Sequence, residues 1–98
     1  MGYRLAPAAD IDLELIYDYG FDQFGQSVAD RYLDELISCF RLLNENPEIA
    51  RMRDEARPPV RAHPFKSHLI IYEIDDKRNI LILRVRNARE GWLRDLDL

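Results

Sequence analysis

Apolar positions in the second half of the chain follow the two-residue period of β-strands. Two β-rich runs, residues 67–74 and 79–86, are joined by a turn-like stretch at residues 75–78, and a shorter run at residues 60–63 precedes them. Three such runs with short links predict an antiparallel meander. Both sides of the longer runs carry apolar side chains, so both faces of the sheet are expected to be covered.

The alternation also assigns side chains to faces of the sheet. In the first long run, one face receives His68, Ile70, Tyr72 and Ile74, and the other receives Leu69, Ile71 and Glu73. In the second long run, one face receives Ile80, Ile82, Arg84 and Arg86, and the other receives Leu81, Leu83 and Val85.

Apolar residues in the first half recur at helical spacing instead. After a short strand at residues 3–5, Pro7 suits the first turn of a helix that is expected to end at Gln23 or Phe24. A break around Gly25 separates it from a second helix, which is expected to run from Ser27 to Leu43 or Asn44, with Asn46-Pro47 as its stop. Because the break is so short, the two helices are predicted to form an antiparallel hairpin.

The predicted order of elements is β-α-α-β-β-β, an α+β fold in which the helical hairpin packs on one face of a small antiparallel sheet. Two helices can cover only one face. The other face therefore needs the C-terminal tail, a second copy of the chain or another protein. The first strand can join either edge of the meander.

Length and composition predict one domain, residues 1–98, with 47% hydrophobic residues. No apolar run approaches the roughly 20 residues that cross a bilayer, and the N-terminus has no apolar signal-peptide region. The single cysteine, Cys39, excludes an internal disulfide framework and favours a reducing cytoplasm.

The charge is uneven along the chain. Residues 1–50 hold three arginines against ten acids, whereas residues 51–98 hold eleven basic residues against eight acids, for a net charge of −4. Either the helices simply carry solvated acids, or a basic face near the sheet meets an acidic partner or nucleic acid. An acidic chain is a poor general binder of nucleic acid, so no direct sequence-specific nucleic-acid binding is expected.

Common catalytic and cofactor motifs are absent from the sequence. None of the three serines lies in a glycine-rich elbow, and the four glycines are scattered, so neither a Ser-His-Asp hydrolase nor a phosphate-cradling loop is indicated. His63 and His68 lack a third metal ligand and are interpreted as ordinary polar or core residues. No metal or cofactor is expected.

Arginines are the more informative residues. Arg61, Arg84, Arg86 and Arg89 lie on or beside the predicted strands, where a planar guanidinium can hold a phosphate or carboxylate. A ribonuclease that used them would also need an acid or base, and beyond the last strand the chain has neither tyrosine nor histidine. The alternative is that these arginines pair with acids of the protein or of a partner.

The order of elements, together with several short stretches, resembles a ParE-type toxin of the RelE/ParE superfamily. The resemblance covers nearly the whole chain. Its stretches are Tyr3-Arg4-Leu5 with Pro7 and Ala8, Asp12-Leu13 with Ile16 and Tyr17, Phe24-Gly25, Ala29 with Tyr32 and Leu33, Leu43 with Asn46-Pro47, Arg61 with Pro64, His68 with Ile70 and Tyr72, and Ile82-Leu83-Arg84-Val85.

The resemblance implies the toxin half of a bacterial type II toxin–antitoxin pair, with a hairpin on an antiparallel sheet and an antitoxin whose C-terminal segment wraps the toxin. ParE-type toxins poison DNA gyrase, whereas RelE-type relatives cut messenger RNA on the ribosome. Two departures favour the ParE branch: the chain is acidic, and Asn87 stands where many relatives carry histidine.

We therefore predict a non-enzymatic toxin that inhibits gyrase or another topoisomerase and forms a hetero-oligomer with its antitoxin in the cytoplasm. The target-binding residues are predicted to be Arg84, Arg86, Arg89 and Trp92, with Arg61 in support. The antitoxin is predicted to bind the sheet face of Ile70, Tyr72, Ile80 and Ile82, or the grooves beside the helices. Two alternatives stay open, a ribosome-dependent mRNA endoribonuclease and a non-toxic member that only binds its antitoxin.

Overall fold

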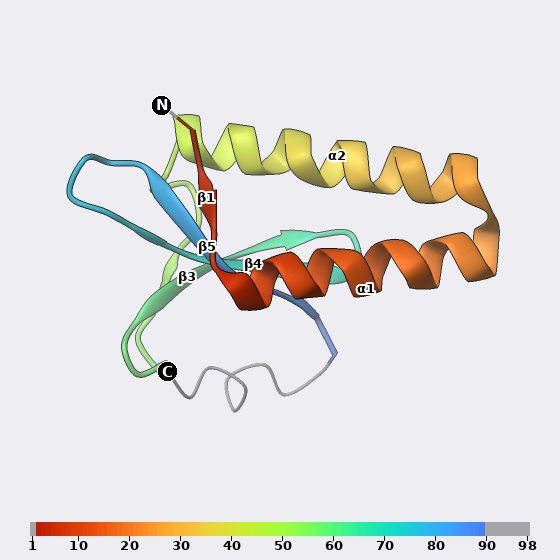
Figure 1. Ribbon diagram of the computed structural model, residues 1–98. Coiled ribbons are helices and arrows are strands. Elements are labelled where there is room, and N and C mark those ends of the chain that lie inside the picture. The colour runs from red at the N-terminus through yellow and green to blue at the C-terminus, as the bar shows by residue number, and fades with distance from the viewer. Residues whose placement is uncertain (1, 90–98) are drawn as a thin grey trace.

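Two helices lie side by side on one face of a five-stranded sheet in the computed structural model, which describes residues 2–89 (Figure 1). The elements along the chain are β1 (Arg4–Leu5), α1 (Pro7–Phe24), α2 (Gln26–Glu45), β2 (Met52–Arg53), β3 (Val60–Phe65), β4 (His68–Ile74) and β5 (Ile80–Asn87). The predicted α+β class and the hairpin are confirmed. Within the described residues, neither helix has the apolar length that a membrane crossing requires.

The strand order across the sheet is β1-β5-β4-β3-β2. The meander of β3, β4 and β5 is antiparallel as predicted, but β1 pairs with β5 in parallel, so the sheet is mixed. This corrects the expectation of a purely antiparallel sheet. The two residues of β2, which pair with β3, come from the connector between α2 and β3, residues 46–59, and were not predicted.

Glycine makes the sharp turn between the two helices. Gly25 is the single residue between α1 and α2, and its φ of 92° is a value that residues with a side chain rarely adopt. Its N–H donates to the carbonyl oxygen of Phe21 at 2.9 Å and closes the last turn of α1. At the other end of α1, Ala6 is extended and Pro7 occupies the first turn, as the sequence predicts.

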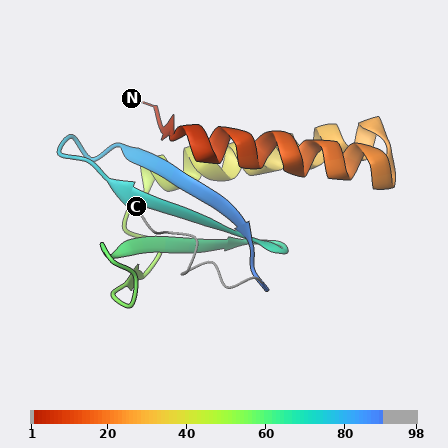
Figure 2. The ribbon, with the colours of Figure 1, turned by 60° about the horizontal axis from the view of Figure 1, so that its bottom comes forward.

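Seen from a second direction, the hairpin lies over one face of the sheet (Figure 2), and the main core fills the layer between them. From α2 it takes Leu36, Phe40 and Leu43, which have no exposed surface. From the sheet it takes four side chains that also have no exposed surface, Ile70, Tyr72, Ile80 and Ile82. Burying one large apolar side chain contributes about 2 kcal/mol to stability, so this layer holds the hairpin to the sheet.

A second, smaller cluster lies on the opposite face of the sheet. It joins Ala56 of the connector to five strand residues, Val60, Ala62, Leu69, Ile71 and Leu83. The prediction that both faces carry buried apolar side chains is therefore confirmed.

A bulge in β5 changes the predicted alternation. Leu83 is the extra residue between the pairs Ile71–Arg84 and Tyr72–Ile82. Val85 consequently joins the main core beneath the helices instead of facing away with Leu81 and Leu83. The strict two-residue period was wrong from this bulge onward.

Candidate functional site

A carboxylate from α1 holds the free edge of β5. The short strand β1 pairs only with Leu81 and Ile82, so among residues 2–89 β5 has no strand neighbour on that side beyond them. There Asp12, which is 5% exposed, accepts a hydrogen bond from the N–H of Val85 at 2.9 Å. The same carboxylate accepts two more from the guanidinium of Arg84, from Nε at 2.8 Å and Nη2 at 3.0 Å. A fork-to-carboxylate pair of this kind fixes both side chains.

Arg84 therefore stabilises the fold through hydrogen bonds to a residue of the same chain. Of the two interpretations of this arginine, pairing with an acid of the protein is the one that the structure shows, because Asp12 holds its guanidinium in a partly buried ion pair. Arg61 is also used internally: its Nη1 donates to the carbonyl oxygen of Ala50 at 2.6 Å and so ties β3 to the connector. For these two residues, bonding within the protein is what the structure shows.

The other predicted target-binding residues are placed differently. Arg86 is half-buried, and it lines a groove beside Asn87 at the end of β5. Arg89 is exposed, and its backbone N–H donates to the Asn87 side-chain oxygen at 2.9 Å. Trp92 lies outside the described residues. The structure thus brings Arg84 and Arg86 to one end of β5, and places Arg61 two strands away on β3.

The sheet residues predicted to bind an antitoxin face the helices. Ile70, Tyr72, Ile80 and Ile82 have no exposed surface, and the Tyr72 hydroxyl donates to the carbonyl oxygen of Pro47 at 2.7 Å within the core. A partner cannot reach them while the hairpin is in place. The assignment of these four residues to a partner face is therefore wrong, whereas the grooves beside the helices remain accessible.

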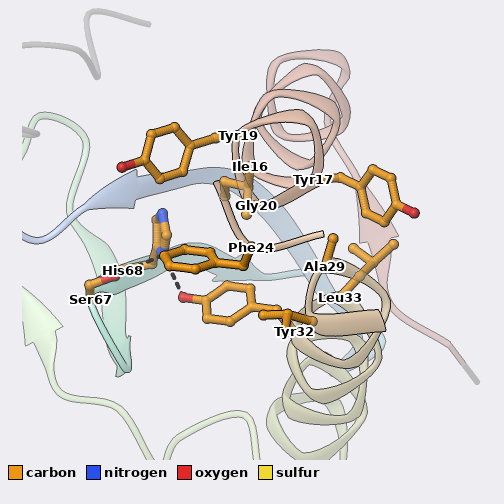
Figure 3. A pocket seen from close by; sticks show the side chains of 11 residues that line it. Ile16, Tyr17, Tyr19, Gly20, Phe24, Ala29, Tyr32, Leu33, Ser67 and His68 are labelled. Carbon is orange, nitrogen blue, oxygen red and sulfur yellow. Dashed lines mark hydrogen bonds between the residues drawn. The ribbon is translucent and has the colours of Figure 1, made fainter. Parts of the chain in front are cut away.

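One accessible site is a cavity of about 160 Å³ where the tip of the hairpin meets the start of β4 (Figure 3). Its rim consists of apolar side chains that are unusually exposed: Tyr19 at 64%, Phe24 at 65% and Val28 at 40%. Figure 3 shows Phe24 over the cavity, with Tyr17 pointing away from it. The lining residues are Ile16, Tyr17, Tyr19, Gly20, Phe24, Val28, Ala29, Tyr32, Leu33, Ser67 and His68.

The polar end of this cavity is a tyrosine–histidine pair. The Tyr32 hydroxyl and His68 Nδ1 are 2.7 Å apart, and the two rings meet edge to face. Burial raises the pKa of the Tyr32 phenol, and the Ser67 hydrogen bond and the Lys66 charge oppose that change less strongly. Since the phenol stays protonated at neutral pH, its O–H can donate a hydrogen bond to Nδ1 when that nitrogen carries no proton.

The cavity opens into a wider groove of about 640 Å³ that runs to the end of β5. Four residues line both spaces, namely Ile16, Tyr19, Ser67 and His68. The far end of the groove adds the side chains of Arg86 and Asn87. The site is thus apolar at the hairpin and polar at the end of β5. Within the described residues, no group of three or more metal-ligating side chains occurs.

This site was missed in the sequence because its members are far apart in the chain. Tyr32 and His68 are separated by 36 positions, and no local spacing joins them. The available signal was the number of aromatic residues near the hairpin turn. One buried stripe of a helix cannot cover all four of them, Tyr17, Tyr19, Phe21 and Phe24.

Comparisons with a family model, with curated proteins and with solved structures all give matches. A family model described as the ParE toxin of the type II toxin–antitoxin system parDE matches residues 3–92. Curated relatives called Toxin ParE1, from two strains of Mycobacterium tuberculosis, are 37% identical over 94 residues, which make up 96% of this chain and 96% of each relative. A solved structure described as the chromosomal ParDE TA system from P. aeruginosa has the same fold, with a TM-score of 0.77 at 20% identity over 91% of this chain and 97% of that one.

Proposed function

The chain belongs to the family of ParE toxins of type II toxin–antitoxin systems, and on that premise we propose that it binds and inhibits DNA gyrase without catalysing a reaction. The observation that carries the proposal is the family match over residues 3–92, which spans every described element. Inhibition ends when a cognate antitoxin binds the toxin. Since gyrase acts on the chromosome, both encounters take place in the cytoplasm.

The bonding of the arginines supports protein binding over RNA cleavage. A ribonuclease face needs guanidinium groups that are free to meet the developing charge on a phosphate. Arg61 and Arg84 instead donate to Ala50 and Asp12 of the same chain. Redirecting Arg84 would leave a buried carboxylate without its partner, which is costly.

The antitoxin, in this proposal, docks at the hairpin-end cavity, which is the cavity between the tip of the hairpin and the start of β4. Tyr19, Phe24 and Val28 expose apolar surface around a space that is deep enough for a side chain. A segment that folds on binding gains most from such pre-formed apolar pockets. This replaces the buried sheet residues as the predicted antitoxin surface, and the complex is a toxin–antitoxin hetero-oligomer.

The test of the toxin activity is a supercoiling assay with purified gyrase. We expect loss of supercoiling when the toxin is added, and recovery when purified antitoxin is added with it. The control is toxin unfolded by heat and returned to the same buffer. Unchanged supercoiling at a stoichiometric excess of folded toxin would remove gyrase as the target.

A second candidate function, ribosome-dependent cleavage of messenger RNA, has one observation in its favour. His68, a possible acid or base, lines the same groove as Arg86. Primer-extension mapping of messages after induction distinguishes the two functions. Cleavage that His68→Gln or Arg86→Ala abolishes would favour the nuclease. A member that only binds its antitoxin would cause no growth arrest when it is expressed alone.

A further inference from the structure

The outer face of α1 exposes a stripe of apolar side chains. Ile11 is 55% exposed, Leu15 is 62% exposed and Tyr19 is 64% exposed. Residues four positions apart stand one above the other on a helix, so these three form a continuous stripe along α1. Tyr19 also lies on the rim of the hairpin-end cavity, and the stripe therefore continues into an apolar recess. Contiguous exposed apolar surface of this kind marks an interaction site.

A row of acids runs beside the stripe with the same spacing. Asp10, Glu14, Asp18 and Asp22 are all exposed, and α1 contains neither lysine nor arginine. Like charges four residues apart repel each other on a helix. Within residues 2–89, none of these four carboxylates takes part in an ion pair. Only Asp10, in the first turn of α1, meets the positive end of the helix dipole, so the rest of the row adds nothing visible to the fold.

On its far side, the acid row borders a second apolar recess. Asp10, Glu14 and Asp18 line a groove between α1 and α2. The apolar residues of that groove include Leu13, Leu33 and Ile37. The outer face of α1 thus consists of a negative ridge with apolar surface on both sides.

We propose that this outer face of α1 is a docking surface for a cationic amphipathic helix of a partner protein. The apolar side chains of that helix would cover Ile11, Leu15 and Tyr19. Its lysines or arginines, repeated every three or four residues, would pair with the acid row. Charge complementarity selects this occupant, because an acidic peptide, a nucleic acid or an anionic membrane would be repelled by the ridge.

The dimensions fit a single helical segment. The 18 residues of α1 span about 27 Å at 1.5 Å per residue, which a partner helix of about the same length matches. Two helices that pack along one another in this way bury one stripe from each. The inference does not depend on gyrase as the target, so a negative supercoiling assay leaves it standing.

The experiment uses two synthetic 18-residue helical peptides with the same leucine stripe. One carries lysine beside the stripe, and the other carries glutamate at the same positions. Fluorescence anisotropy of labelled peptide, titrated with the full-length toxin, gives a Kd for each at low and at moderate salt. We expect the lysine peptide to bind and the glutamate peptide to bind at least about tenfold more weakly.

Three variants of the toxin identify the surface. The double change Glu14→Gln with Asp18→Asn keeps the apolar stripe, and it is expected to weaken binding of the lysine peptide about tenfold and to reduce its salt dependence. Leu15→Ser keeps the charges, and it is expected to weaken binding while the salt dependence stays. The matched control, Asp34→Asn with Glu45→Gln on α2, removes the same charge from other exposed positions, and it is expected to change the Kd less than about twofold.

Each remaining outcome contradicts the proposal. Equal weakening by the α2 control would mean that the lysine peptide responds only to net negative charge. Equal binding of the glutamate peptide would exclude charge recognition. A toxin that forms a dimer in light scattering, and that becomes a monomer when Glu14 and Asp18 are neutralised, would show that a second copy of the chain occupies this face. Circular dichroism of every variant confirms that the helices are retained.

Discussion

Asp12 and Glu14 lie on opposite sides of α1, and their carboxylates differ in exposure and in bonding. Asp12 is almost fully buried, and it accepts three hydrogen bonds from Arg84 and Val85. Glu14 is exposed in a row of like charges. One carboxylate completes the sheet edge, whereas the other makes no ion pair with any described residue. The role of an acid in this helix is thus decided by what faces it.

The same contrast applies to Arg84. An arginine in a strand sequence indicates the ability to bind an anion. The sequence does not show whether that anion belongs to the same chain or to a partner. Arg84 finds the carboxylate of Asp12, which is 72 positions away in the chain. The Arg84 guanidinium is therefore engaged within the fold, whereas the hairpin and the outer face of α1 expose side chains that the sequence did not single out.

Removal of the buried carboxylate should give the largest effect on stability. Asp12→Ala leaves the Arg84 guanidinium and the Val85 N–H without their partner, and it is expected to lower the free energy of unfolding by about 3 kcal/mol. Urea denaturation followed by circular dichroism measures the loss.

The matched double variant distinguishes loss of the whole ion pair from the cost of leaving one charged partner unpaired. Asp12→Leu combined with Arg84→Met removes both charges, so it should cost clearly less than Asp12→Ala alone. A loss below about 1 kcal/mol for Asp12→Ala would show that the carboxylate behaves as an exposed one. The contrast between the two sides of α1 would then not hold.

Apolar residues on the two sides of α1 provide the next test. Leu13 is 9% exposed and belongs to the main core, whereas Leu15 is 62% exposed. Leu13→Ala is expected to lower stability by about 2.5 kcal/mol, because it leaves a cavity under the hairpin. Leu15→Ala should change stability by less than about 0.5 kcal/mol. Equal losses in thermal unfolding would mean that the stripe already packs against the protein.

The two glycines of the hairpin should respond in opposite directions to alanine. A Cβ on Gly20 would meet Ala29 at 3.6 Å, which is an ordinary contact, so Gly20→Ala should stabilise the helix by about 0.7 kcal/mol. Gly25 has open space around it but a positive φ, so Gly25→Ala should destabilise by about 1 kcal/mol. If Gly20→Ala is destabilising instead, α1 and α2 pack too closely at this point for a methyl group.

Periodicity predicted the fold well because the helices and the meander are long and regular. Both helices begin and end within two residues of the predicted positions. The two-residue strand β2 was missed because so short a segment has no period to detect. The bulge at Leu83 was missed for a related reason: an inserted residue shifts the alternation without changing the composition of the strand.

The site was predicted less well, since periodicity groups side chains by face but does not identify the face that the helices cover. Ile70 and Tyr72 were correctly placed together, yet on the wrong side for a partner. The Tyr32–His68 pair and the Asp12–Arg84 pair join distant parts of the chain, and only the folded arrangement reveals them. The exposed acids of α1 were noted only as part of an uneven charge.

Neutralising part of the acid row should have the smallest effect and the opposite sign to Asp12→Ala. The double change Glu14→Gln with Asp18→Asn removes repulsion along the row and keeps Asp10, whose charge favours the positive end of the helix dipole. We expect the midpoint of thermal unfolding to rise by about 3 °C at low salt.

Salt decides whether repulsion is the cause of that rise. In about 0.5 M sodium chloride the charges of the row are screened over a few ångströms, so the increase should shrink toward zero. Asp34→Asn with Glu45→Gln, the control on α2, should give a smaller increase because those acids do not form a row along one helix face. A fall in the midpoint for the α1 variant would show that the acids stabilise the isolated toxin. Both sides of α1 would then stabilise the fold, and this result would contradict the proposal that the outer face of α1 binds a partner.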